Sequence, residues 1–196
     1  FWEGDGGVYR TTLHFVQKDR RILEHIRSLL RVDSAICSDN GGMRPSITGY
    51  GRLRALFDLL GALVVIPGRV EQLRQLGVAV GSNEFVRSHE PTRHWFTGFW
   101  DAEGSSSVSQ VDVTPVLAVQ VSQKNRKVLE QCIELWGGGC ICKGAGRDCS
   151  TLNFTGPLCW TVGEWLLETS RNTDKRGALH ERMYSLQEYN RTRKGR

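Results

Sequence analysis

The stretch FTGFWDAEG, residues 96–104, decides the fold, because part of it recurs at the start of the chain as FWEGDG, residues 1–6. Each copy joins aromatic side chains to two carboxylates and a glycine. In a helix over the longer copy, Gly98 and Ala102 lie four residues apart on one face, and Glu103 lies at the C-terminal tip. Small residues on one face would let two such helices approach each other closely.

The similarity between the two halves of the chain extends beyond this motif. HFVQKDRRILEHIRSLL, residues 14–30, resembles QVSQKNRKVLEQCIELW, residues 120–136. Farther along, the Thr-Gly pair at 48–49 corresponds to the Thr-Gly pair at 155–156. The second half also holds about eight more residues directly after its motif. The sequence therefore indicates two repeats of one structural plan.

Hydrophobic spacing predicts the same order of elements in both repeats. Apolar and polar residues alternate at 12–15 and 118–121, which indicates strands, and helical spacing follows at 22–30 and 128–136. The remaining elements are hairpins at 35–48 and 140–155 and helices at 52–60 and 158–168. We therefore predict an α+β protein of two pseudo-symmetric αββαββα repeats.

The predicted domains are a first repeat at 1–76, a linker at 77–92, a second repeat at 93–185 and a basic tail at 186–196. The linker is polar, contains glycine and lacks periodicity. Thr92 is the predicted N-cap of the second motif helix. The first copy begins at the fourth letter of the motif, so its repeat is N-terminally truncated, and we expect either a stub of a helix or a segment supplied from elsewhere.

The first hairpin is expected to be reduced. Only ten residues, 8–17, lie between the glycines of the first motif and Lys18. A two-stranded ribbon with its turn would need about twelve or more. One of the strands is therefore predicted to be missing or very short.

Composition narrows the class of protein. The net charge is +5, with both halves slightly basic, which favours a nucleic-acid partner only weakly. The most apolar stretch, residues 59–68, is about half as long as a membrane span requires. Four of the six cysteines run as C-x-C-x6-C-x9-C without paired C-x2-C knuckles, so packing is favoured over a zinc module.

The two motif copies suggest a metal site. Parallel motif helices related by a pseudo-twofold axis would bring Asp5 and Glu103 side by side. Two carboxylates this close disfavour joint ionisation unless a cation lies between them. Mg²⁺ suits carboxylate oxygens together with water, and such sites serve phosphodiester hydrolysis. We therefore predict that Asp5 and Glu103 bind Mg²⁺.

With these residues in view, the chain resembles the single-chain, two-motif LAGLIDADG homing endonucleases. Residues 96–104 fill all nine letters of that motif, and residues 1–6 supply its last six. The resemblance implies a site-specific endonuclease that hydrolyses double-stranded DNA with a divalent metal. It also places Gln17 and Gln123, in VQKD and SQKN, in the shell around the metal-bound water.

The family commonly adds a basic residue to the catalytic pocket, ahead of the last helix of each half. Here the resemblance implies Arg69 in the first half and Lys175 in the second, with Arg171 as a competitor. A cation at this place would stabilise the charge that builds on the phosphate.

The resemblance implies a saddle in which two antiparallel sheets flank the paired motif helices and lie in successive major grooves. The partner would be double-stranded DNA with a long, asymmetric target site. Polar side chains on the strands and hairpins would contact bases or phosphates. The candidate DNA-binding residues are Arg10, Thr12, His14, Arg44, Ser46, Gln110, Asp112, Gln120, Ser122, Lys143 and Arg147.

A second hypothesis is a non-cleaving binder on the same scaffold, either an intron RNA maturase or a DNA-binding regulator. The presence of both acids favours catalysis, because a pure binder has no need for two carboxylates beside a polyanion. The resemblance further implies an intracellular monomer, in an organelle (chloroplast or mitochondrion) or a bacterial cytoplasm. Intron RNA stays an alternative partner, and no membrane association is expected.

Overall fold

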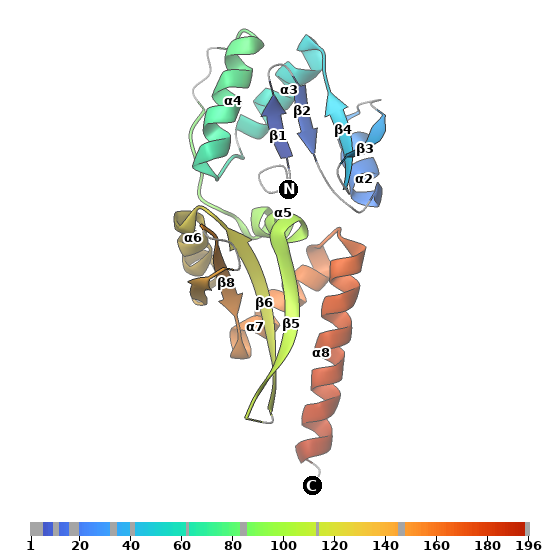
Figure 1. Cartoon of the computed structure of the whole chain (residues 1–196), viewed down its shortest axis with the longest axis vertical. Coiled ribbons are helices and arrows are strands. Elements are labelled where there is room, and N and C mark those ends of the chain that lie inside the picture. Colours follow the sequence, from blue (N-terminus) through green and yellow to red (C-terminus); the bar gives the residue numbers. More distant parts are fainter. Residues whose placement is uncertain are drawn as a thin grey trace. The chain divides into compact units, whose positions relative to one another are not determined.

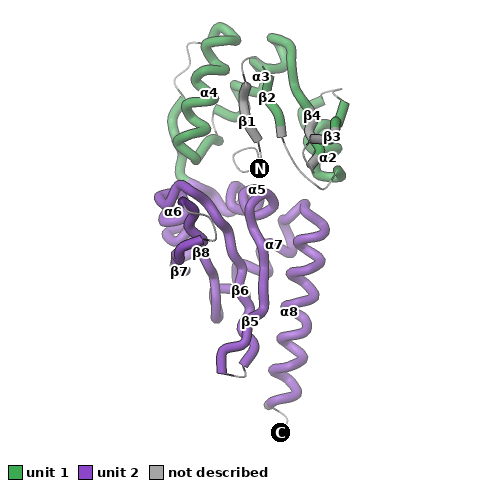
Figure 2. The backbone as a smooth tube through the Cα atoms, in the orientation of Figure 1, with its two compact units in different colours: residues 1–90 green, residues 91–196 purple. Residues whose placement is uncertain are grey.

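The structure is a computed structural model, and it describes residues 6–9, 12–15, 20–31, 35–39, 42–61, 63–82, 86–112, 114–144 and 148–194. The chain forms two compact units, unit 1 with residues 1–90 and unit 2 with residues 91–196 (Figure 2). Each unit contains a four-stranded antiparallel sheet with helices packed against it (Figure 1).

Unit 1 contains, in chain order, β1 (Gly6–Tyr9), β2 (Thr12–Phe15), α2 (Arg20–Leu30), β3 (Ile36–Asp39), β4 (Gly42–Ile47), α3 (Tyr50–Gly61) and α4 (Pro67–Ala79). Its sheet has the strand order β1-β2-β4-β3. The core side of the sheet carries Leu13 opposite Ile47, and both side chains are buried with Leu23, Leu53 and Phe57 from the helices.

Unit 2 contains α5 (Arg93–Glu103), β5 (Gly104–Val111), β6 (Thr114–Gln123), α6 (Arg126–Trp136), β7 (Cys140–Lys143), β8 (Ser150–Phe154), α7 (Gly156–Thr169) and α8 (Thr173–Lys194). Its strand order, β5-β6-β8-β7, repeats that of unit 1 element for element. The prediction of an α+β fold built from repeated ββα units with antiparallel sheets is therefore confirmed.

The hairpins that follow the two motifs differ in length. β1 and β2 pair over four residues each, from Gly6 opposite Phe15 to Tyr9 opposite Thr12. Neither strand is missing, and both are very short, which is the second of the two predicted outcomes. The hairpin fits because β1 begins at the motif glycine itself and only two residues separate the paired ends. In β5–β6 the pairing extends over eight pairs, which accounts for the extra residues of the second half.

Both units end with one helix more than the predicted αββαββα pattern. In unit 1 this helix is α4, and it continues to Ala79. The predicted linker at 77–92 therefore begins inside a helix. The reason is tertiary packing, because Leu76 and Val80 continue the buried face of α4 against the unit 1 core.

In unit 2 the additional helix is α8, and it runs to Lys194. The predicted tail at 186–196 is therefore mostly helical. Leu179, Met183 and Leu186 are buried at spacings of four and three residues, which extends an apolar stripe along the helix. α8 lies beside the β5–β6 hairpin in unit 2 (Figure 1). None of the helices in the described part of the chain is long and apolar enough to cross a membrane.

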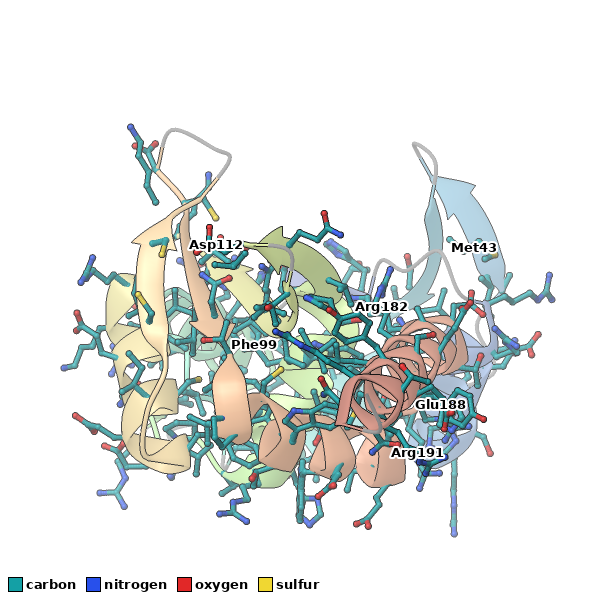
Figure 3. The ribbon with its side chains drawn as sticks, turned by 90° about the horizontal axis from the view of Figure 1, so that it is seen from below. Met43, Phe99, Asp112, Arg182, Glu188 and Arg191 are labelled. Atoms are coloured by element: carbon teal, nitrogen blue, oxygen red, sulfur yellow. The ribbon has the colours of Figure 1, made fainter. Side chains whose placement is uncertain are left out.

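Arginine side chains tie α8 to this hairpin. Arg182, labelled on α8 in Figure 3, donates a hydrogen bond from its Nη1 atom to Ser106 Oγ at 2.7 Å. Farther along the helix, Arg193 Nη1 donates to Thr114 Oγ1 at 3.3 Å. These two bonds connect α8 to both strands of the hairpin.

Local signals in the motif define α5. Thr92 precedes the helix with extended backbone dihedrals, and its Oγ1 accepts a hydrogen bond from Trp95 N at 3.1 Å. The predicted N-cap is confirmed. Phe96, Phe99 and Trp100 are buried with at most 1% exposure, so the aromatic residues of the motif anchor α5 in the core of its own unit.

Candidate active site and nucleic-acid interface

The residue directly after the motif helix is glycine because no larger residue fits there. α5 ends at Glu103, and Gly104 begins β5 directly. A Cβ atom at position 104 would overlap Cδ1 and Cγ of the Trp100 indole and lie 2.6 Å from its Nε1. Since Trp100 is fully buried, the ring has no room to move. The carboxylate of Glu103 is therefore presented at the helix end, where its residue is half-buried.

Asp101, the other carboxylate of the motif, is buried with 4% exposure, and the groups around it are parts of the protein that it holds together. Its Oδ1 accepts a hydrogen bond from Ser170 Oγ at 2.5 Å, and its Oδ2 accepts one from Arg171 N at 2.9 Å. Asn172 Nδ2 donates to the Asp101 carbonyl oxygen at 3.2 Å. Asp101 therefore fastens the connection between α7 and α8 to the end of α5, a role that we did not predict from the sequence.

Lys175 is held at the same end of α5. Its Nζ donates to the carbonyl oxygens of Trp100 at 3.2 Å, Asp101 at 2.9 Å and Ala102 at 2.8 Å. These carbonyls belong to the last turn of the helix, where the negative end of the helix dipole favours a cation. The ammonium group therefore caps the helix next to Glu103. With three backbone acceptors on a group that has three protons, its effect on a bound phosphate would come from its charge.

Arg69 occupies the position in unit 1 that corresponds to Lys175. Arg69 is the third residue of α4, and Lys175 is the third residue of α8. Arg69 Nη1 donates to Gln72 Oε1 at 2.8 Å. Arg171, the competitor for the role of Lys175, has an exposed side chain on the connection before α8. The matched positions favour Lys175 over Arg171 as the basic residue of the second repeat.

Part of the predicted site lies outside the described residues. These predictions concern Asp5, Gln17, Arg10 and Arg147. Gln123 is described and ends β6, where its Oε1 accepts a hydrogen bond from Lys124 N at 2.8 Å. Within the described ranges, no three His, Cys, Asp or Glu side chains are grouped to hold a metal ion.

The sheet of unit 2 has one apolar and one polar face. Val119, Val121 and Leu152 are buried toward the helices. The alternating positions form the outer face, where two rows cross the strands. The first row is Ser105, Gln120, Asn153 and Cys140, and the second is Ser122, Thr151 and Cys142. Ser122 Oγ and Thr151 Oγ1 are hydrogen-bonded at 2.8 Å.

This register locates the predicted DNA-binding residues of unit 2. Gln120 and Ser122 lie on the outer face. Gln110 pairs with Pro115 and shares a face of β5 with Val108, so it lies on the face opposite to Ser105 and Gln120. Lys143 pairs with Ser150 and likewise lies on the face of the sheet opposite to the outer face. Asp112 is exposed in the β5–β6 turn (Figure 3).

Sequence reasoning missed the other residues of these two rows. They are Ser105, Thr151, Asn153, Cys140 and Cys142. These residues could have been found only with the strand register, that is, with the pairing of β6 with β8 and of β8 with β7.

In unit 1 the register groups the predicted residues on one face. His14 pairs with Ser46, on the side opposite to the buried pair of Leu13 and Ile47. In β2, position 12 lies on the same face as His14, and in β4, position 44 lies on the same face as Ser46, because residues two apart in a strand share a face. The predicted positions in this sheet therefore share its outer face.

The fold with these two matched units is that of the LAGLIDADG homing endonucleases. No protein-family model matches the sequence, and no curated protein sequence matches it. Solved structures do match the chain in their fold. The I-SmaMI LAGLIDADG homing endonuclease bound to cleaved DNA superposes with a TM-score of 0.66 at 16% identity, over 98% of this chain and 88% of that chain.

Two other solved structures show the same fold. The LAGLIDADG meganuclease I-AabMI bound to uncleaved DNA has a TM-score of 0.68 at 17% identity, over 98% of this chain and 90% of that chain. The LAGLIDADG homing endonuclease I-GzeII in complex with its DNA target has a TM-score of 0.63 at 14% identity, over 92% and 81%. The predicted resemblance is confirmed at the level of the fold.

Proposed function

We propose that the protein is a site-specific endonuclease that hydrolyses double-stranded DNA with a divalent metal ion. The observation that carries this proposal is the carboxyl end of α5, where the ammonium group of Lys175 is fixed beside the residue that ends the helix, Glu103. A cation on the last carbonyls of a motif helix that ends in a half-buried acidic residue suits a site that must accept both a metal and a phosphate.

The metal proposal rests on the chemistry of the donors. Glu103 supplies a carboxylate of the kind that Mg²⁺ prefers, and Asp5 would supply the second from the other motif copy. A bound Mg²⁺ would contribute Lewis-acid chemistry to phosphodiester hydrolysis. The chain's own groups would orient the attacking water through Gln17 and Gln123 and stabilise phosphate charge through Lys175 and Arg69.

The DNA proposal rests on the outer faces of the two sheets. Hydroxyl and amide groups in rows across antiparallel strands offer donors and acceptors to base edges in a major groove. The solved structures that share the fold contain proteins bound to DNA. We propose a long, asymmetric duplex as the target of one intracellular monomer, since both repeats lie in a single chain.

The test begins with duplexes that the protein selects from a random pool. We expect the wild-type protein to cut a selected duplex on both strands with Mg²⁺ and to bind it without cutting when Ca²⁺ replaces Mg²⁺. Glu103→Gln should abolish cutting of one strand while binding persists, and Asp5→Asn should do the same. Glu134→Gln is the control, because Glu134 is exposed on α6 away from the motif.

Binding without cutting by the wild-type protein in Mg²⁺, with Glu103→Gln binding equally well, would establish the non-cleaving binder instead. A preference for structured RNA over every selected duplex would point to an RNA-binding role on the same scaffold.

A further inference from the structure

Two exposed thiols meet on the outer face of the unit 2 sheet. Cys140 and Cys142 are both exposed, and they lie on the same face of β7 because side chains two residues apart share a face. Their Sγ atoms are 3.8 Å apart. No role in the proposed DNA cleavage accounts for this pair.

The other cysteines provide a contrast. Cys132 and Cys159 are buried, and burial raises the pKa of Cys132 to about 12 and that of Cys159 to about 11. These two thiols are therefore inert in the folded protein, because the thiolate is the reactive form. Cys37 is exposed on β3, where it pairs with position 44 of β4. In unit 2 the equivalent pair is Cys142 of β7 with Thr151 of β8. Cys37 provides an exposed thiol at the matching place in unit 1.

The backbone of β7 can accommodate a bond between the two sulfurs with a small adjustment. Cα atoms two residues apart in a strand are about 6.6 Å apart, within the upper end of the range that disulfides span, about 4.4–6.8 Å. The sulfurs would have to approach from 3.8 Å to about 2.05 Å. β7 is the edge strand of the sheet, and among the described strands it pairs only with β8, so it can contract without disturbing a second one of them.

The pair lies within the surface proposed to read DNA. Cys140 ends the row that contains Gln120 and Asn153, and Cys142 ends the row that contains Ser122. Contraction of β7 would shift the ends of both rows. A strained disulfide also has a more oxidising potential than a relaxed one, so its formation would be readily reversed.

We propose that Cys140 and Cys142 form a dithiol modification site that closes to an intrachain disulfide with low-molecular-weight disulfides, and that the closed form binds DNA more weakly. The second part rests on the proposed function. The thiolate of one cysteine attacks the S–S bond of the reagent, which forms a mixed disulfide and releases one reagent thiolate. The other cysteine then loses its proton to solvent, attacks the protein sulfur of the mixed disulfide and releases the second reagent thiolate.

The exchange balances in protons and electrons. Two protein thiols lose two protons and two electrons, and the reagent disulfide is reduced to two thiols. Closure should accelerate as the pH rises, because both attacks require a thiolate. The hydrogen bond with Cys142 raises the pKa of Cys140, which moves this acceleration to higher pH than for an isolated cysteine.

The first experiment measures the bond itself. The folded protein is treated with oxidised glutathione, freed of reagent, denatured and alkylated, and its tryptic peptides are weighed. We expect the peptide of residues 128–143 to lose two hydrogens and to be alkylated only at Cys132. Cys149→Ser should behave like the wild type. Cys142→Ser should instead keep glutathione on Cys140.

Two outcomes of this experiment would overturn the pairing. One is a wild-type protein whose two cysteines each carry a separate glutathione, or whose two cysteines both stay free and are alkylated. The other is a Cys142→Ser protein that still loses two hydrogens through a different partner. Both readouts are independent of DNA.

The second experiment measures binding to the selected duplexes by fluorescence anisotropy. We expect the oxidised wild-type protein to bind roughly tenfold more weakly than the reduced protein, comparable to the loss of one good base contact. With Cys37→Ser introduced in both proteins, so that the exposed thiol of unit 1 cannot react, the double variant Cys140→Ser/Cys142→Ser should show no effect of the oxidant. Equal affinity of closed and reduced protein would overturn the coupling to DNA. If the reduced protein binds no duplex, the proposed function fails, while the peptide mass still decides the disulfide.

Discussion

The carboxylate of Asp101 accepts a 2.5 Å hydrogen bond from the hydroxyl group of Ser170, 69 residues later in the chain, and both residues are buried. This bond joins the motif helix α5 to the segment that leads into α8. Since Lys175 N donates to Asn172 Oδ1 at 3.1 Å in the same segment, the contact also sets the place of the Lys175 side chain. The motif thus uses its two carboxylates differently, one buried for structure and one presented at the helix end.

Asp101→Asn should destabilise the protein. An amide group can accept a hydrogen bond through its oxygen, but its NH₂ group would face either the Ser170 hydroxyl or the Arg171 N–H. We expect a loss of about 1–3 kcal/mol in the free energy of unfolding, measured by urea denaturation. Asp112→Asn is the control, because Asp112 is exposed with a φ of 46° that asparagine tolerates. Equal stability of Asp101→Asn and wild type would contradict the structural role.

Lys175→Met should separate catalysis from binding. The change removes the cation at the end of α5 but keeps an unbranched side chain of similar length. If the charge of Lys175 stabilises the phosphate, kcat should fall about a hundredfold at saturating DNA while the Kd for the duplex changes little. Lys127→Met, on the exposed surface of α6, should leave both unchanged. A helix cap without a catalytic effect would lower Tm and leave kcat intact.

The signals that the sequence carried reliably are local ones. Thr92 precedes a helical pattern and caps α5, and Gly104 follows the last aromatic turn and ends it. Such signals involve residues within one turn of each other. The repeat itself was also visible, because the order of elements depends on hydrophobic spacing that both halves share.

Features that depend on contacts between distant segments could not be predicted from the sequence. The continuation of α4 into the predicted linker depends on the burial of Val80 in the core that α4 packs against. The face of the sheet on which Gln110 lies depends on the register of β5 with β6, and a shift of one residue would move Gln110 to the other face. The role of Asp101 depends on Ser170, which hydrophobic spacing near the motif could not reveal.

Two glycine substitutions should have opposite effects on stability. Gly104→Ala would drive a Cβ atom into the buried Trp100 ring, and we expect a loss of about 1–3 kcal/mol from this overpacking. Gly177 is an exposed position of helix α8, with no atom within 4 Å of an added Cβ. Gly177→Ala should gain about 0.5–1 kcal/mol, because alanine loses less backbone entropy in a helix. Thermal unfolding of both variants measures the difference, and a stable Gly104→Ala protein would refute the close packing.

Gln120→Ala should relax base specificity more than Gln110→Ala. Gln120 lies on the outer face of the sheet next to Asn153, whereas Gln110 lies on the opposite face, in β5. A glutamine that reads a base edge contributes about 1–3 kcal/mol of discrimination. We expect selection from a random duplex pool to lose preference at one base position for Gln120→Ala and to stay unchanged for Gln110→Ala. The reverse result would mean that the hairpin meets DNA with its other face.

The buried thiols should make the stability of the protein fall in alkaline solution. Burial raises the pKa of Cys132 to about 12 and that of Cys159 to about 11, whereas an unfolded cysteine ionises near pH 8.5, about its usual value. Below this pH both states keep the thiol proton, and the stabilisation is fully present. Above it the unfolded state loses protons that the folded state retains, so the free energy of unfolding decreases with rising pH.

The variant Cys132→Ala tests this sign. A single thiol of this kind contributes a slope of at most about 1.4 kcal/mol per pH unit between the two pKa values. The variant is expected to be less stable at neutral pH because it leaves a small cavity, yet its stability should decline less steeply than that of the wild type above about pH 8.5. Urea denaturation at a series of pH values gives both slopes. Parallel slopes would show that the Cys132 thiol ionises as readily in the folded protein as in the unfolded chain.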